Sequence, residues 1–412
     1  MKGVTIAIIG AGGRGQGYAE YAQKHPSEGK VVAVADPVAF RREKLRREHR
    51  IPAENAFADW RGLAARKKLA DAVIIGTQDR MHTEPAIAFA KRGYHMILEK
   101  PMAPTAEECR EIVKAVKKAG VIFAVGHVMR YTAYYEALKK LIDKGAVGEV
   151  MAVQHIEPVG FWHQAHSFVR GHWRNSKLSS FMLLAKSCHD IDILQFLIGK
   201  RCVEVSSFGA LSHFRKEARP KGAGKRCFTC KIERKCPYSA KKIYLSGAHP
   251  DWVRFSVSDD QSPAAFKKAL ATGPYGRCVY ACDNDVVDHQ VVNLLYEDDV
   301  TASFVMTAFS AHGGRETRIM GTMGEIVAGH GTITHNDFRT GKSVTYDPAA
   351  KVKGGHGGGD EGLMKGFLSA VAKNDPSLIA SGPDVSLETH LTVFAAEEAR
   401  LKGTVERIAD YL

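Results

Sequence analysis

A glycine-rich turn follows the first apolar segment of the chain. Residues 4–9 are apolar and rich in β-branched side chains, and the turn after them consists of Gly10, Ala11, Gly12, Gly13, Arg14 and Gly15. Gly10 permits a tight turn, Gly12 lets a pyrophosphate approach the backbone, and Gly15 lets the next helix pack closely on the strand. The free amides at the start of that helix attract phosphate. The turn therefore predicts a phosphate-binding site.

Asp36 lies at the position where a carboxylate can bind the ribose of a nucleotide. The second apolar run, residues 31–35, ends at Asp36. A carboxylate at this point can accept hydrogen bonds from both ribose hydroxyls and would repel a 2′-phosphate. We therefore expect NAD as the cofactor, with NADP disfavoured. Arg41 and Arg42 follow closely enough in sequence to weaken that preference.

Strands and helices alternate through residues 1–127 and would position these groups. Apolar runs at 72–76, 94–98 and 121–125 predict further strands. Helices are expected at 16–24, after the loop 77–81 through Lys91, and at 106–119. This alternation predicts a parallel, doubly wound sheet of the Rossmann type. Ligands of such sheets lie beyond the carboxyl ends of the strands. The cofactor contacts expected at those ends are Thr77, Gln78, His82, Glu99 and Lys100.

Composition and charge narrow the class of protein. A chain of 412 residues with 45% hydrophobic and 25% charged residues is ordinary for a two-domain globular enzyme. We expect a cytoplasmic protein with no membrane partner, because no apolar run is long enough to cross a bilayer and no signal peptide is evident. The net charge is +13. No basic run is interleaved with aromatic residues, so we expect no nucleic-acid partner.

Several short motifs occur together outside the glycine turn. Glu99-Lys100-Pro101 ends a predicted strand, Thr77–His82 forms a loop, and Cys188-His189-Asp190-Ile191-Asp192 opens a helix. The segments 126–131 and 319–325 add an Arg-aromatic pair and a glycine-containing hairpin. In this combination the chain resembles the Gfo/Idh/MocA oxidoreductases, apart from residues 213–285.

The resemblance implies an architecture and a reaction. It implies an α/β protein in which residues 128–412 form a substrate-binding and oligomerisation α+β domain with a large, mostly antiparallel open sheet. It implies a homodimer or homotetramer acting on a small-molecule sugar or polyol. Lys100 and His189 would face the nicotinamide as catalytic residues. The family's usual aspartate four residues before the histidine is Ala185 here, which leaves Lys186, Asp190 or Asp192 as candidate replacements.

Lys100 and His189 have the chemistry that hydride transfer requires. An imidazole with an ordinary pKa of about 6.5 can take the hydroxyl proton near neutrality. An ammonium can orient that hydroxyl, stabilise the developing alkoxide or share the base role. Taken singly, each residue also has an ordinary structural explanation, as a solvated lysine or a packed histidine.

Two other segments are suited to sugar recognition. Residues 161–166 and 169–174 are dense in aromatic rings and hydrogen-bond donors, and residues 355–360 form a glycine-rich stretch with a histidine and an aspartate. The second stretch could equally be a plain surface loop, and Trp173 could equally be part of the core. The predicted substrate-binding residues are Lys100, Arg130, Tyr131, His163, Trp173, Arg174, Lys186, His189, His356 and Asp360.

Five of the eight cysteines lie within an insertion at about 213–285. Cys227 and Cys230 form a Cys-x-x-Cys pair, Cys236 follows, and Cys282 is the predicted fourth ligand of a structural zinc site, with Cys278 as the alternative. Reduced thiols and a disulfide are the other possibilities. Four thiolates would leave no open position on the metal for catalysis. The insertion is expected to form a lid or an oligomer contact.

Three functions remain open on sequence grounds. The first is NAD(P)-dependent oxidation of a sugar or glycoside ring hydroxyl, with C3 favoured by the family resemblance. The second is a redox-neutral, NAD-dependent glycosidase or lyase that works by transient C3 oxidation and elimination. The positive charge weakly favours an anionic substrate, such as a uronate or a sulfonated sugar. The third is a sensor that binds NAD and a sugar without catalysis.

Overall fold

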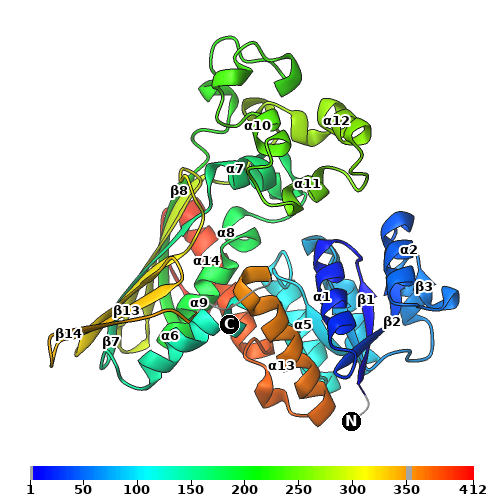
Figure 1. Ribbon diagram of the computed structural model, residues 1–412. Helices are drawn as coiled ribbons and strands as arrows, with labels where there is room; N and C mark the ends of the chain where they lie inside the picture. The colour runs from blue at the N-terminus through cyan, green and yellow to red at the C-terminus, as the bar shows by residue number, and fades with distance from the viewer. Residues whose placement is uncertain (1–2, 349–354) are drawn as a thin grey trace.

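Two sheets organise the chain. The computed structural model describes residues 3–348 and 355–412. A parallel sheet with its helices forms one part, a larger sheet seen nearly edge-on forms the other, and a helical lobe lies above both (Figure 1). This arrangement confirms the predicted fold class.

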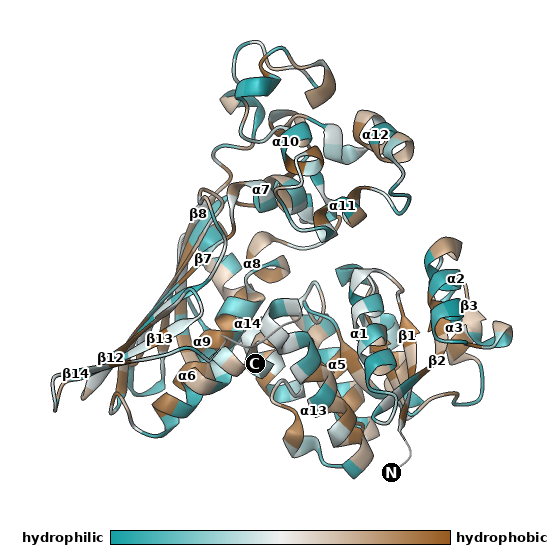
Figure 2. Cartoon of the chain, viewed as in Figure 1, coloured by the Kyte–Doolittle hydropathy of each residue, from teal (hydrophilic) through white to brown (hydrophobic). Residues whose placement is uncertain are grey.

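The first sheet is parallel and buried on both faces. Its strand order is β3-β2-β1-β4-β5-β6. The topological switch point lies between β1 and β4, and doubly wound sheets bind ligands at this point. The strands are β1 (Val4–Ile9), β2 (Gly29–Ala35), β3 (Ala56–Phe57), β4 (Ala72–Ile75), β5 (His95–Leu98) and β6 (Phe123–Val125). The helices between them are α1 (Gly13–Lys24), α2 (Ala39–Glu48), α3 (Trp60–Ala64), α4 (Thr83–Lys91) and α5 (Ala106–Ala119). The apolar strands lie inside this layer of amphipathic helices, as the colouring in Figure 2 shows.

The second sheet is mixed and mostly antiparallel. Its order is β14-β13-β12-β11-β7-β10-β9-β8-β15, and β7 and β10 run parallel. The strands are β7 (Val150–Pro158), β8 (Cys202–Ala210), β9 (His289–Tyr296), β10 (Thr301–Thr307), β11 (Glu316–Gly321), β12 (Gly324–Gly329), β13 (Thr332–Asp337), β14 (Lys342–Tyr346) and β15 (Val405–Arg407). Three helices, α6 (Ala133–Asp143), α9 (Cys188–Ile198) and α14 (Pro383–Lys402), pack on one face of it. That face carries the core of the second domain.

One helix from the C-terminal part of the chain completes the first domain. Helix α13 (Gly359–Lys373) lies beside α1 (Figure 1), and its apolar residues Leu363, Phe367 and Leu368 share a core with Ile6 and Ile8 of β1. Sequence analysis assigned the whole of 128–412 to the second domain. The structure differs here because the apolar face of α13 is buried against the first sheet.

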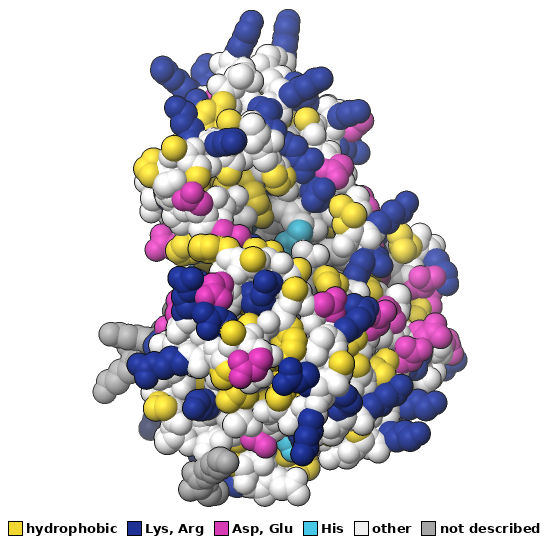
Figure 3. Space-filling model, turned by 90° about the vertical axis from the view of Figure 1, so that its right-hand side faces the viewer, with side chains coloured by type: hydrophobic (Ala, Val, Ile, Leu, Met, Phe, Trp, Pro, Cys, Tyr) yellow, Lys and Arg dark blue, Asp and Glu magenta, His cyan; other side chains and the backbone are white. Residues whose placement is uncertain are grey.

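The insertion forms a lobe with its own core. Between β8 and β9 it contains α10 (Ala240–Leu245), α11 (Trp252–Val257) and α12 (Pro263–Thr272). The lobe packs on α7 (Phe161–His163) and on the π-helix Gln164–Arg170. An ion pair of 3.1 Å between Arg41 of α2 and Asp259 joins it to the first domain. A hollow separates the lobe from the body below, and a histidine side chain is visible within it (Figure 3).

The described helices include none with the length and apolar character needed to cross a bilayer.

Candidate active site

The glycine turn has the geometry that a dinucleotide requires. Gly10 has φ +88°, and a Cβ there would lie 2.7 Å from the Gly76 carbonyl oxygen. A Cβ at Gly15 would lie 2.0 Å from the Gly10 carbonyl oxygen, whereas a Cβ at Gly12 would meet nothing within 4 Å. The protein's own packing therefore requires Gly10 and Gly15. Gly12 faces open space, where a ligand can approach the backbone.

The groups around this turn fit the pyrophosphate and one ribose of a dinucleotide. Helix α1 starts at Gly13 without a side-chain cap, so its first amides are available to a pyrophosphate. Asp36 is buried and accepts hydrogen bonds of 2.7 Å from the amides of Ala11 and Val38. Each carboxylate oxygen keeps a further lone pair for a ribose hydroxyl. Arg42 donates to the main-chain oxygen of Asp36, which places a cation beside the predicted ribose site.

A buried network links the turn to the end of β5. Glu99 accepts hydrogen bonds from Arg14 Nε at 2.7 Å and from the Tyr18 hydroxyl at 2.5 Å. Burial raises the pKa of Glu99, but Arg14 and Tyr18 outweigh it, so the pKa lies below its ordinary value. Arg14 also pairs with Asp360 at 2.8 Å. Arg14 and Glu99 therefore shape the cofactor pocket as an ion pair.

The loop after β4 is tied to the loop after β5. His82 has no exposed surface, and its ring nitrogens bond the main-chain oxygens of Pro101 at 2.8 Å and Thr77 at 3.2 Å. In this arrangement His82 joins two loops and has no nitrogen left for a cofactor. Thr77 is half-buried and Gln78 is exposed at the same edge of the sheet, where they remain predicted cofactor contacts.

Lys100 and His189 come from different domains and meet. Lys100 follows β5, and its Nζ donates a hydrogen bond of 2.9 Å to the main-chain oxygen of Ala185, just before α9. His189 lies in the first turn of α9 and is 5% exposed. Burial, followed by the nearby charge of Lys100, holds the pKa of His189 well below its ordinary value. His189 is therefore a neutral imidazole at pH 7.

Further histidines extend from His189. Its ring centroid lies 5.9 Å from that of His127 and 6.2 Å from that of His356. His127 is completely buried, neither of its ring nitrogens has a hydrogen-bond partner within residues 3–348 and 355–412, and burial lowers its pKa to about 4. His356 bonds Asp360 at 3.1 Å. Sequence reasoning found His356 and missed His127, because a histidine after a strand carries no motif of its own.

Two family models cover most of the chain. One, described as an oxidoreductase family with an NAD-binding Rossmann fold, matches residues 4–127, and the other, described as the C-terminal alpha/beta domain of an oxidoreductase family, matches residues 139–400. The chain belongs to the Gfo/Idh/MocA oxidoreductase family. The NAD-binding domain is thus the one that the glycine turn predicted.

Individual relatives agree with this assignment. The oxidoreductase YteT of Bacillus subtilis, described as putative, is 26% identical over 315 residues, which cover 72% of this chain and 71% of YteT. The 2,7-anhydro-N-acetylneuraminate hydratase of Escherichia coli is 31% identical over 211 residues, 51% of this chain and 54% of the hydratase. A solved levoglucosan dehydrogenase in complex with NADH and L-sorbose is 19% identical, covers 99% of both chains and has a TM-score of 0.73. The chain spans about half the length of the hydratase, and the likeness to the solved structure concerns the fold.

The three candidate replacements for the missing family aspartate differ in their contacts and burial. Lys186 Nζ pairs with Glu157 of β7 at 2.7 Å, and Glu157 also lies 3.0 Å from Arg315. Asp190 and Asp192 are completely buried, Asp190 against Arg315 and Asp192 against Arg130. Of the three candidate replacements, Lys186 is the one with an exposed part, 15% of its side chain.

Glu157 and Arg315 escaped sequence reasoning. They lie on or near strands far apart in the chain, and only the sheet brings them together. Glu157 carried a weak signal, since His155 and Glu157 occupy alternate, inward-facing positions of β7. Polar residues on the buried face of a strand are unusual unless they are paired.

Some predicted substrate residues are engaged elsewhere. Arg130 is buried in an ion pair with Asp192, and the Tyr131 hydroxyl bonds Ser381 at 2.9 Å. Arg174 pairs with Asp283 of the insertion at 2.8 Å. Their polar groups hold elements together, so we do not include them in the proposed site.

Trp173 lies at the junction of the domains. It is half-buried against the core of the second domain, and its Nε1 is 3.4 Å from Asp79 Oδ1. The other oxygen of Asp79 accepts hydrogen bonds of 2.8 Å from Ser179 and Ser180. Asp79, which sequence reasoning missed, thereby connects the loop after β4 to the second domain.

His163 is a predicted substrate residue that lies near Lys186 and Lys100. Burial, then the charges of Lys186, His166 and Lys100, hold its pKa well below the ordinary value. Its ring packs against the rings of Trp162, Phe168 and Trp252. An aromatic wall with a neutral imidazole therefore borders the lysines.

The predicted metal ligands need one correction. Cys227, Cys230, Cys236 and Cys278 line a single cavity, whereas Cys282 is not among its lining residues and its Sγ lies 3.3 Å from the Cys278 main-chain oxygen. The geometry therefore favours Cys278, the alternative, over Cys282 as the candidate fourth ligand. All four thiols are free, and within the described residues no three His, Cys, Asp or Glu side chains already converge as metal ligands.

Proposed function

We propose that this protein transfers hydride between a ring hydroxyl or ketone of a sugar or glycoside and the nicotinamide C4 of NAD, with C3 the favoured carbon. The observation that carries the proposal is the approach of Lys100, at the end of β5, to the segment just before the helix that carries His189, so that the two side chains come from different domains and lie near each other. Membership of an NAD-binding oxidoreductase family supports it.

The chain's own residues divide the work. When NAD is bound, it supplies the hydride acceptor. His189, neutral at pH 7, takes the proton of the substrate hydroxyl. Lys100 donates a hydrogen bond to the same oxygen and stabilises its developing negative charge. Gly12 and the start of α1 hold the pyrophosphate, and Asp36 holds the ribose.

The side chains near Lys100 and Lys186 favour a sugar as the substrate. His163 with the rings of Trp162 and Trp252 offers an apolar surface for a sugar face. Lys186, Glu157 and Arg315 offer charged donors and acceptors for hydroxyl groups. The names of relatives, which include a levoglucosan dehydrogenase and an inositol 2-dehydrogenase, support the same class.

Reduction of NAD tests the proposal. The purified protein is incubated with NAD⁺ and a panel of neutral sugars, polyols, glycosides and uronates, and NADH formation is followed by absorbance. We expect steady NADH accumulation with at least one sugar and its loss in Lys100→Ala and His189→Ala. If wild type turns over no member of the panel, the proposed activity is wrong and a sensor function replaces it. If both variants keep full activity, Lys100 and His189 are not the catalytic residues.

A redox-neutral glycosidase or lyase is the second candidate. Elimination after transient oxidation requires a second acid–base group besides His189, and His356 with Asp360 provides such a pair 6.2 Å from the His189 ring. A relative named as a hydratase gives further support. Glycoside cleavage without net NADH, blocked when NAD is removed, would identify this function. Net NADH without release of the aglycone would identify the dehydrogenase.

A further inference from the structure

The far end of the insertion lobe lacks the burial that usually holds a segment in place. Residues 211–239 contain three short 3₁₀ turns and neither an α-helix nor a strand. Among residues 215–237, Cys227 is the only buried one. Ordering one residue costs about 1–2 kcal/mol of backbone entropy, which so little buried apolar surface cannot offset. A segment of this kind ordinarily needs a cross-link or a metal ion.

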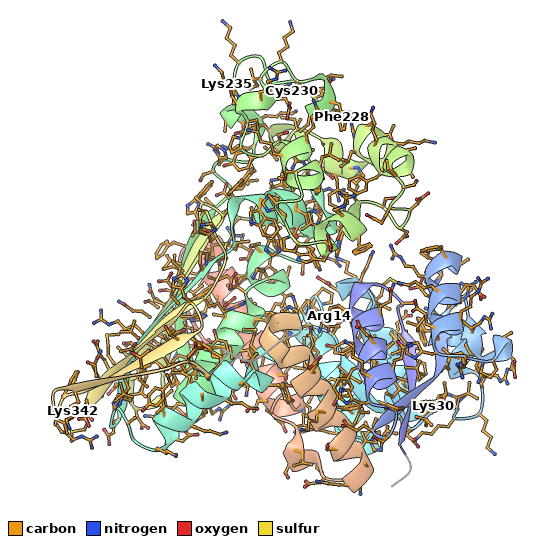
Figure 4. The ribbon with its side chains drawn as sticks, viewed as in Figure 1. Arg14, Lys30, Phe228, Cys230, Lys235 and Lys342 are labelled. Atoms are coloured by element: carbon orange, nitrogen blue, oxygen red, sulfur yellow. The ribbon has the colours of Figure 1, made fainter. Side chains whose placement is uncertain are left out.

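Four cysteines meet at this segment. Cys227, Cys230, Cys236 and Cys278 line one cavity of about 20 Å³. Because a single water molecule needs about 10–15 Å³ by the same measure, this cavity holds one ion or one water and excludes any organic ligand. Figure 4 shows Cys230 in the outermost part of the lobe, far from Arg14 of the dinucleotide turn. The cavity is therefore separate from the active site.

The backbone brings the fourth cysteine to the other three. Arg226 and Arg277 form an isolated antiparallel bridge, and the Cys278 amide donates a hydrogen bond of 2.9 Å to the Lys225 main-chain oxygen. This bridge sets Cys278 beside Cys227 although 50 residues separate Cys227 from Arg277. Cys282 lies one turn farther on and does not line the cavity.

Backbone amides point at two of the four sulfurs. The amide of Ala240 donates to Cys227 Sγ at 3.4 Å, and the amide of Gly224 donates to Cys230 Sγ at 3.3 Å. Hydrogen bonds from the backbone to sulfur stabilise negative charge on the sulfur. Two of the four sulfurs are thus provided with donors by the loops that carry them.

The buried guanidinium of Arg170 has no carboxylate among its hydrogen-bond partners in the described part of the chain, which indicates that an anion is missing from this site. Arg170 lines the cavity and is 1% exposed. Its hydrogen bonds go to the main-chain oxygens of Arg277 and Tyr238 and to Cys227 Sγ at 3.6 Å, and its Nη1 has no partner within the described residues. A buried guanidinium needs an anion nearby. A zinc ion with four thiolates has a net charge of about −2 and supplies that anion.

We propose that Cys227, Cys230, Cys236 and Cys278 bind one structural zinc ion, with the buried Arg170 as its counter-charge. On binding, the four thiols release their protons to solvent, and the sulfurs, which do not converge without metal, are drawn around the ion. Four protein ligands leave no position for a substrate, so the ion is structural. It stabilises the outer lobe and, through Arg170, fixes the π-helix Gln164–Arg170 that follows His163.

Metal analysis of the full chain with a matched pair of variants tests this inference. The protein is produced in zinc-supplemented medium, purified under reducing conditions and analysed by elemental mass spectrometry. We expect about one zinc per chain in wild type and in Cys282→Ser, and almost none in Cys278→Ser. Cobalt replacement should give the visible bands of tetrahedral thiolate ligation in wild type and Cys282→Ser alone.

Limited proteolysis gives a readout that does not depend on activity. The exposed Lys221, Lys231 and Lys235 are sites for trypsin, and we expect a chelator to increase cleavage there at least tenfold while the rest of the chain resists. The inference is overturned by wild-type protein without stoichiometric metal, by zinc that survives Cys278→Ser but not Cys282→Ser, by bound iron with cluster absorbance, or by an intact mass showing a disulfide.

Discussion

The guanidinium of Arg14 pairs with the carboxylate of Asp360 at 2.8 Å, although 346 residues separate them in the sequence. Arg14 lies in the dinucleotide turn, and Asp360 lies at the start of α13 and also binds His356. The carboxylate of Asp360 therefore connects the cofactor turn to helix α13, which completes the first core. It also connects both to His356, whose ring centroid lies 6.2 Å from that of His189.

This pairing predicts an energetic coupling between the two ends of the chain. In a double-mutant cycle of Arg14→Gln and Asp360→Asn, we expect a coupling of about 1 kcal/mol in the free energy of unfolding, at the low end for contacting pairs because both side chains are partly exposed. Urea titration at low and high salt measures it, and added salt should reduce it. Effects that add within about 0.5 kcal/mol would show that the contact contributes nothing.

Two glycines in the turn should fail for different reasons. Gly15→Ala places a Cβ 2.0 Å from a backbone oxygen, so we expect loss of stability in thermal unfolding. Gly12→Ala meets no protein atom within 4 Å, so we expect a change in stability of about 1 kcal/mol or less and at least a tenfold loss of NAD affinity by calorimetry. Gly17→Ala, exposed on α1 with nothing within 4 Å, is the control, and it should keep NAD affinity and raise helix stability by up to about 1 kcal/mol. Unchanged NAD binding in Gly12→Ala would place the pyrophosphate elsewhere.

Lys100 and His189 should affect turnover more than cofactor binding. We expect His189→Ala to lower kcat by about 10²–10⁴-fold, the usual contribution of a positioned acid or base, and Lys100→Ala to lower it comparably, with NAD affinity kept within a few-fold. His330→Ala and Lys342→Ala are controls, since both residues are exposed and far from the site. A fall in NAD affinity as large as the fall in kcat would instead indicate a role in binding.

Cofactor preference should depend on Asp36 and Arg42. Asp36→Asn removes the charge that repels a 2′-phosphate while keeping one acceptor for the Ala11 amide, so NAD affinity should fall about tenfold or more and NADP should gain relative to NAD. Arg42→Gln should weaken NADP alone. Cofactor titrations by fluorescence give both dissociation constants. If Asp36→Asn leaves the NAD/NADP ratio unchanged, the carboxylate does not face the ribose.

Buried neutral histidines should make the fold sensitive to mild acid. Burial lowers the pKa of His127 to about 4 and the pKa values of His166 and His390 to about 3, whereas an unfolded chain has histidines near pH 6.5. Below about pH 6.5 the unfolded state binds more protons, so the free energy of unfolding falls as pH falls toward these folded-state values. Each such histidine contributes a slope of at most about 1.4 kcal/mol per pH unit.

His127→Gln tests this slope without breaking a hydrogen bond, because neither ring nitrogen of His127 has a partner among the described residues. Between pH 6 and 5, we expect the His127→Gln variant to take up about one proton less on unfolding than wild type does. The free energy of unfolding of the variant should therefore fall less steeply as the pH falls, which denaturant titration at successive pH values measures. His330→Gln, whose side chain is 77% exposed, should leave the slope unchanged. An equal slope in His127→Gln would mean that His127 is protonated in the folded protein.

Local pattern predicted the elements that bind the cofactor. The run of β1, the glycine turn, α1 and β2 is a local arrangement, because each glycine is needed by neighbours within the same unit, as at Gly10 and Gly15. Lys100 and His189 were found because short motifs fix them at the end of a strand and the start of a helix. The parallel, doubly wound form of the first sheet followed from the alternation of strand and helix.

Tertiary structure alone decided which distant groups meet. Glu157 and Arg315 carry no motif, and their pairing depends on β7 and β11 lying side by side in the sheet. Cys278 and Cys282 are equivalent by spacing, but the Arg226–Arg277 bridge directs only Cys278 to the cavity. The chain order of these residues does not encode their contacts, because contacts across sheets and between domains are set by packing of whole elements. The sequence by itself therefore predicted the dinucleotide unit and the candidate catalytic pair, while the folded chain determined their surroundings.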